Sequence, residues 1–132
     1  MSDAASNYLE NELLDHVLNH STASFAAENT LYLALFHGTA ASVKANLEAG
    51  TLTDEITLGN YSRQTIAFNT ASGGSATNNG AVQFPVATAN YDGAVTCIAV
   101  MDAATAGNVY FYGELTVAKT VTTGDQFQIA DT

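Results

Sequence analysis

The alternation of apolar and polar positions towards the C-terminus predicts the central element of the fold, an antiparallel β-meander. Strand-forming residues fill three runs, at 95–101, 109–117 and 125–129. Two clusters rich in Ala, Gly, Asn, Asp and Thr separate these runs, at residues 102–108 and 118–124. Short runs bounded by such clusters are typical of consecutive strands joined by turns.

A different period predicts a helix over residues 8–19. Apolar residues recur there at intervals of three and four positions, so that they form one stripe along the helix. These residues are Leu9, Leu13, Leu14, Val17 and Leu18. Asn7 is the expected N-cap, and Glu10 follows three residues later, where it completes a capping box. We expect the stripe to pack against the strands that follow.

Further strands are expected at residues 30–37, 61–68 and 81–85. In the first of these runs leucines alternate with Tyr, Ala and Phe, so both faces of the strand are apolar and we expect both to be covered. Residues 40–49 predict a short second helix, which Gly50 would end.

These elements predict a single, mainly β domain over residues 1–132, with a helix at about 8–19 and a strand-rich region at 30–130. Short strands separated by regular turns favour an antiparallel β-sandwich or jelly-roll-like domain, with the N-terminal α-helix packed alongside. A chain of 132 residues suits one domain and can bury a substantial core.

The negative net charge of the chain limits the partners that it can bind. Hydrophobic residues make up 47% of the chain and charged residues 12%, which is the composition of a folded protein and not of an acidic disordered tail. Thirteen acidic residues against three basic ones give a net charge of −10. No basic footprint is available for phosphates, which excludes nucleic acid and anionic membranes as partners. The carboxylates serve either solubility or the binding of a cation or a basic partner.

The sequence suits folding in the cytosol. Cys97 is the only cysteine, so an internal disulfide is excluded, and its apolar neighbours indicate a small buried side chain. The longest apolar run, residues 31–36, is too short to span a bilayer. We also find no basic region followed by a long apolar core at the N-terminus, so we expect no signal peptide.

Candidate chemistry is sparse. His16 and His20 are four residues apart and could share a metal, but the sequence indicates no third ligand. Cys97 with His37 is conceivable as a catalytic dyad, yet Cys97 lies in the middle of a predicted strand. No serine has the GxSxG context of a hydrolase, although paired carboxylates for glycoside cleavage stay open. We therefore predict no enzyme activity, no catalytic residue, no metal and no cofactor.

Candidate interface residues are easier to find. Tyr110 and Tyr112 share one face of a predicted strand, opposite Val109 and Phe111, and we expect them to form an exposed aromatic patch. Arg63 is expected to pair with a carboxylate, within the protomer or across an interface. The candidate interface comprises Arg63, Tyr110, Tyr112, Gln126, Phe127 and Ile129.

Four segments carry a resemblance to a known family. They read SNYLENELLDHVL, NTLYLALFHG, GNYSRQTIAFNTASGGSATNNGAVQFPVAT and DAATAGNVYFYGELTVAKTVTTGDQFQI. Together they resemble small virion proteins of tailed bacteriophages that are commonly labelled phage tail fibre proteins. The resemblance implies a structural role and supplies no active site. It also implies one more apolar strand after the FQI segment, so we expect either that this strand is lost here or that another chain completes an edge near residues 127–129.

From these observations we expect a non-enzymatic virion protein made in the host bacterial cytoplasm. The favoured form is a capsid decoration (cement) protein that binds the major capsid protein on the outer capsid surface and stabilises the shell. We expect it to bind copies of itself, as a trimer around a local symmetry axis. The alternative is a small tail fibre or tail-surface protein that binds a receptor or a carbohydrate. A small hydrolase is the third hypothesis.

Overall fold

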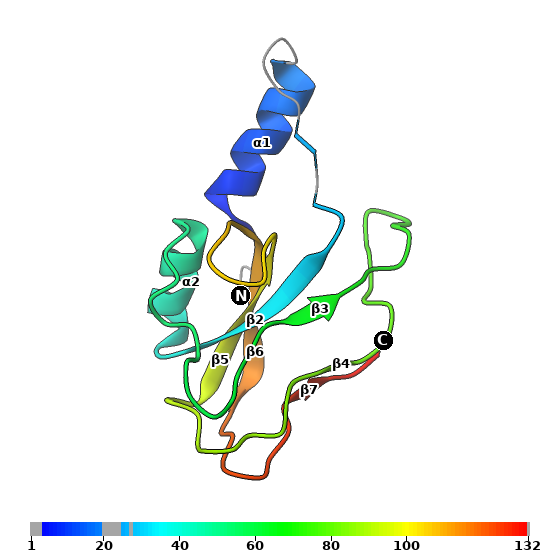
Figure 1. Ribbon diagram of the computed structural model, residues 1–132. Coiled ribbons are helices and arrows are strands. Elements are labelled where there is room, and N and C mark those ends of the chain that lie inside the picture. The colour runs from blue at the N-terminus through cyan, green and yellow to red at the C-terminus, as the bar shows by residue number, and fades with distance from the viewer. Residues whose placement is uncertain (1–3, 20–24, 27, 132) are drawn as a thin grey trace.

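Two antiparallel sheets and two helices make up the fold (Figure 1). The computed structural model describes residues 4–19, 25–26 and 28–131. In chain order the elements are β1 (Ala4–Ala5), α1 (Asn7–Leu18), β2 (Leu31–His37), α2 (Ala40–Glu48), β3 (Gln64–Ile66), β4 (Val82–Gln83), β5 (Val95–Met101), β6 (Val109–Lys119) and β7 (Gln128–Ile129).

The larger sheet has the strand order β1-β6-β5-β2-β3, and all of its neighbouring strands are antiparallel. β5 and β6 form the first hairpin of the predicted meander. The third run does not continue it, because β7 pairs with β4 in a separate two-stranded sheet. The mainly β, antiparallel class with an N-terminal helix is confirmed, and the second helix is present as α2.

Each face of the larger sheet carries its own hydrophobic core. On one face Ala34 and Phe36 of β2 pack with Val43 and Leu47 of α2. On the other face Leu33 packs among residues of the β4–β7 sheet and the long loops. Figure 1 shows α2 and the β4–β7 pair on different sides of β2 and β5. The prediction that both faces of residues 30–37 are covered is therefore confirmed for the middle of the strand.

Helix α1 joins the sheet only through its first turns. Ser6 is the N-cap, since its side chain accepts a hydrogen bond from the backbone N–H of Leu9, so the expected cap at Asn7 was wrong by one residue. Leu9 is buried, but it is the only buried residue of the helix. Figure 1 shows the remainder of α1 projecting beyond the end of the sheet, so most of its apolar stripe does not pack on the strands as expected.

Membrane insertion through a helix finds no support in the described ranges. Neither α1 nor α2 combines the length and the apolar character that a bilayer-crossing helix requires.

Candidate interaction surfaces

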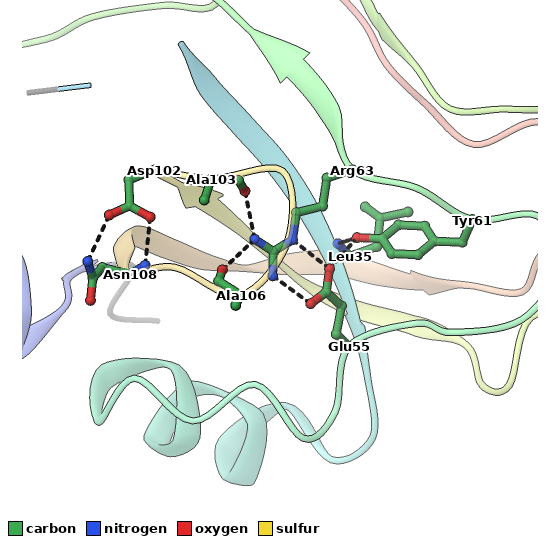
Figure 2. Close-up of polar contacts among 8 residues, drawn as sticks. All are labelled: Leu35, Glu55, Tyr61, Arg63, Asp102, Ala103, Ala106 and Asn108. Atoms are coloured by element: carbon green, nitrogen blue, oxygen red, sulfur yellow. Dashed lines mark hydrogen bonds and ion pairs between the residues drawn. The ribbon is translucent and has the colours of Figure 1, made fainter. Parts of the chain in front are cut away.

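Arg63 is buried within the protomer and binds other segments of the same chain (Figure 2). Its Nε and Nη2 atoms each donate a hydrogen bond of 2.7 Å to a different carboxylate oxygen of Glu55. Its Nη1 atom donates to the backbone carbonyl oxygens of Ala103 and Ala106, at 2.8 and 2.7 Å. The side chain is only 2% exposed. Of the two expectations for Arg63, pairing within the protomer is the one that the structure contains.

Interactions within this cluster raise the pKa values of both Arg63 and Tyr61. Burial lowers the pKa of Arg63, but the hydrogen bonds and negative charge of Glu55 outweigh it, and the net pKa is raised. The Tyr61 hydroxyl donates to Glu55 at 2.9 Å and accepts the backbone N–H of Leu35 at 3.0 Å. Burial, and then the charge of Glu55, raise the pKa of Tyr61 far above its ordinary value. Tyr61 therefore stays a neutral hydrogen-bond donor at neutral pH.

Asp102 fixes the same connection between β5 and β6 from its other side. Its carboxylate accepts the backbone N–H of Asn108 at 2.7 Å and the side-chain amide of Asn108 at 2.8 Å. Figure 2 shows the guanidinium of Arg63 and the carboxylate of Asp102 at opposite parts of this loop. Together the two side chains give residues 102–108 one defined conformation, which is a structural role.

Tyr110 and Tyr112 are not an exposed patch. They are 5% and 6% exposed, so the expectation of exposure was wrong, while their role at an interface stays untested. The ring of Tyr110 stacks on Tyr8 of α1, with centroids 6.1 Å apart. The hydroxyl of Tyr112 donates to Glu48 of α2 at 3.3 Å. Phe111 lies opposite the tyrosines as predicted, but Val109 does not, because a register shift between Val100 and Met101 places Val109 in the same core as Tyr112. Both helices contribute contacts to the tyrosine face.

The exposed aromatic of β6 is Phe111, on the opposite face and 51% exposed. It is paired with Val100 of β5. Phe68, which is 40% exposed, lies across a groove of about 430 Å³ from these strands. We call this the Phe111 groove, and its lining residues include Leu31, Phe68, Ala76, Val100 and Phe111. Sequence alternation placed Phe111 opposite the tyrosines but could not say which face is covered.

The three predicted interface residues near the C-terminus have different positions. Phe127 is 7% exposed and packs edge-on against Phe84, with centroids 5.6 Å apart. The side-chain amide of Gln126 donates to the backbone carbonyl of Phe84 at 2.9 Å. Ile129 is partly buried and lines a groove of about 540 Å³ that β6 also borders, near Val117. Their part in an interface is not tested by these positions.

Strand β7 has one open edge. β4 pairs with it on one side, and no other strand of the described chain pairs with it on the second side. An unpaired edge beside an apolar groove can receive an extended segment by backbone hydrogen bonding. That another chain completes this edge stays a prediction.

The residues considered for chemistry are not gathered into a site. Cys97 is fully buried, and His37 lies 3.8 Å from Asp92, as an ion pair only when the imidazole is protonated. His16 is exposed on α1, and His20 lies outside the described residues. Among the described side chains, no three His, Cys, Asp or Glu residues are grouped as metal ligands would be.

The second exposed apolar surface lies on α1. Leu13, Leu14, Val17 and Leu18 are 44%, 55%, 69% and 75% exposed, and we call these four residues the α1 stripe. The helical period identified these residues from the sequence. What the sequence could not supply was that the helix projects from the sheet and leaves them exposed.

Comparison with known protein families gives a match over nearly the whole chain. The model of a family described as "Podophage GP4 fiber I protein gp80" matches residues 4–132. No curated protein matches the sequence.

Proposed function

We infer the function from one premise, that this chain belongs to the podophage GP4 fiber I protein gp80 family. It is therefore a structural protein of a phage virion. We propose that it is a subunit of a podophage fibre on the tail. The family description supports the tail over the capsid, although size, acidity and a compact β fold also suit a decoration protein.

The observation that carries the proposal is the pair of exposed apolar features on the β sheets. A stretch of 132 residues without heptads or fibre repeats needs further subunits to build a long fibre. The Phe111 groove and the open edge of β7 supply surfaces for such contacts. We propose that copies of this chain join through these two features. Edge pairing would fix the register, and burial of Phe111 would stabilise the contact.

The receptor- or carbohydrate-binding alternative has less support. Its aromatic platform would have consisted of Tyr110 and Tyr112, which are buried. The exposed rings in their place, Phe68 and Phe111, lack a hydroxyl with which to orient a polar ligand. A non-enzymatic role is part of the proposal, and it is supported by the family and by the burial of Cys97.

The experiment is to count and locate the chain in purified particles. Quantitative mass spectrometry is applied to intact virions and to heads and tails separated from them. We expect the chain in the tail fraction, at a copy number close to that of other tail proteins. Hundreds of copies in the head fraction would instead support a capsid decoration protein that binds the major capsid protein, and absence from particles would reject both.

A further inference from the structure

The α1 stripe gathers more exposed large apolar side chains than any other element of the described chain. The described residues include nine such side chains, and four of them lie on this one helix. Leu14 and Leu18 are four positions apart, as are Leu13 and Val17, so all four belong to one side of the helix. Exposure rises from 44% at Leu13 to 75% at Leu18, along the part of α1 that projects from the sheet in Figure 1.

The fold does not use the stripe. Helix α1 is held by its start, where Ser6 is fully buried, Leu9 is 4% exposed and the Tyr8 ring stacks on Tyr110. No residue after Leu9 is buried in this helix. An exposed apolar face of this size on a small protein marks an interaction site. The question is therefore what covers it.

The charges on α1 select the partner. Glu10 lies on the side of the helix that carries the stripe, one turn before Leu13 and Leu14, and Asp15 lies beside Leu18, whereas Glu12 lies on the opposite side. Neither Glu10 nor Asp15 forms an ion pair within the described ranges. A groove that receives this helix would bring its rim close to Glu10 and Asp15, so a rim of Lys and Arg is complementary. An anionic lipid surface or a nucleic acid would be repelled.

A second copy of the chain does not supply that complement. Of its three cations, Lys44 lies 2.8 Å from Glu114 and Arg63 lies 2.7 Å from Glu55. The third, Lys119 at the end of β6, is a single charge and cannot by itself form a rim of Lys and Arg. Two α1 helices packed stripe to stripe would also bring together the carboxylates of Glu10 and Asp15 from both copies. Like charges across an interface oppose association.

We propose that α1 is a docking helix whose stripe is received by an apolar groove with a Lys- and Arg-rich rim on a different protein. This inference rests on the proposed function in naming a partner for the fibre subunit. It differs from the contacts between copies, which use the Phe111 groove and the β7 edge. The helix would thus attach the subunit, while the sheets extend the assembly.

The test uses phage propagated on cells that supply the full-length chain, and it begins with a matched pair of variants. Leu14→Asp changes a side chain that is 55% exposed on the stripe, and Leu58→Asp changes one that is 54% exposed in a loop. We expect both to fold with unchanged circular dichroism. Leu14→Asp should lower the number of copies per particle at least tenfold, and Leu58→Asp should leave it unchanged. Normal incorporation of Leu14→Asp would overturn the proposal.

Charge is tested with Asp15→Lys, and Glu12→Lys on the opposite side of the helix is its control. We expect Asp15→Lys to lower incorporation several-fold, because its carboxylate no longer faces a basic rim, and Glu12→Lys to change incorporation less. The neutral variant Asp15→Asn should give a smaller loss than Asp15→Lys. Incorporation raised by Asp15→Lys would overturn the basic rim of the partner's groove.

The partner is identified with a photo-crosslinking residue, p-benzoyl-phenylalanine, placed at position 17. Crosslinking is done in infected cells as well as in particles, so that it does not depend on packaging. We expect one different protein, joined at an apolar residue with Lys or Arg nearby. Crosslinks between two copies of this chain would overturn the inference. If the chain is absent from particles, the proposed function fails, while the crosslink still decides the inference.

Discussion

Arg63 and Glu55 form a bidentate ion pair, in which two guanidinium nitrogens each lie 2.7 Å from a separate carboxylate oxygen. The same guanidinium also binds the carbonyl oxygens of Ala103 and Ala106. One side chain therefore joins the start of β3 to the loop after α2, eight residues earlier, and to the distant connection between β5 and β6.

Replacing Arg63 should destabilise the fold strongly. Arg63→Met leaves the carboxylate of Glu55, 17% exposed, without its partner and leaves two carbonyls without a donor. Removing one member of a buried pair typically costs about 3–5 kcal/mol. We expect a loss of that size in the free energy of unfolding, measured by urea denaturation. The double variant Glu55→Leu with Arg63→Met should recover part of the loss, and a loss below about 0.5 kcal/mol for Arg63→Met would contradict the structural role.

Ser6 should stabilise the start of α1 and its attachment to β6. Its hydroxyl donates to the carbonyl of Val109 and accepts the N–H of Leu9, so Ser6→Ala removes a cap and a link to β6. We expect a cost of about 1–2 kcal/mol, seen as faster amide hydrogen exchange in the first turn of the helix. Asn7→Ala is the control, since Asn7 is exposed and is not the cap. Equal effects of the two variants would contradict this assignment.

Gly59 should tolerate no side chain. Its φ is +76°, and an added Cβ would lie 2.6 Å from the carbonyl oxygen of Ala89 and 2.7 Å from the Tyr91 ring. Gly50 has a similar φ of +79° with no atom within 4 Å of the added Cβ. Gly50→Ala should therefore cost only the backbone strain, about 1 kcal/mol, whereas Gly59→Ala should cost about 3 kcal/mol. Thermal unfolding of the two variants measures the difference, and similar values would contradict the close approach.

Asp92 should contribute to stability in a defined range of pH. Burial raises the pKa of Asp92, but the hydrogen bonds from Thr57 and the nearby His37 outweigh it, so the net pKa lies below its ordinary value. The contribution is complete above the unfolded pKa of about 3.9 and is lost as pH falls through the lower folded pKa. The difference in unfolding free energy between the native chain and Asp92→Asn should shrink on acidification through this range. A difference that stays constant would contradict the shift.

Phe111 should matter for assembly and not for folding. Because its ring is 51% exposed, Phe111→Ser should change the unfolding free energy by less than about 0.5 kcal/mol. The same change at buried Tyr112 should cost about 3 kcal/mol. Light scattering of the purified chain and copy number in particles report assembly. If Phe111→Ser assembles normally, the Phe111 groove is not a contact between copies.

Local sequence patterns predicted where the helices and strands lie better than they predicted which faces of these elements are buried. The period of four identified α1 within one residue at each end, and alternation identified β5 and β6. Alternation also separated Phe111 from the tyrosines. It could not say which side is buried, because that depends on where α1 and α2 lie. The N-cap was misplaced because Ser6 and Asn7 are both good caps, and only the contact of Ser6 with β6 decides between them.

Long-range pairing was beyond the sequence. The sequence predicted a carboxylate partner for Arg63 but could not indicate that it is Glu55, although the two residues are only eight positions apart. The last strand was assigned to the meander because it follows β6 directly. It instead reaches β4, where Phe84 and Phe127 pack together. Such pairings depend on side-chain packing between distant segments, which no local period records.

Because Cys97 is buried, its reaction with a thiol reagent can measure how often this part of the fold opens. Its thiol is fully covered, with Sγ 3.9 Å from the carbonyl oxygen of Ala40 at the start of α2. A thiol reagent can reach it only when α2 lifts from the sheet or the chain unfolds. With a single cysteine in the sequence, the rate of modification measures that opening without any engineered label. Comparing free subunits with subunits in particles would then show how far assembly slows the opening of this face of the protein.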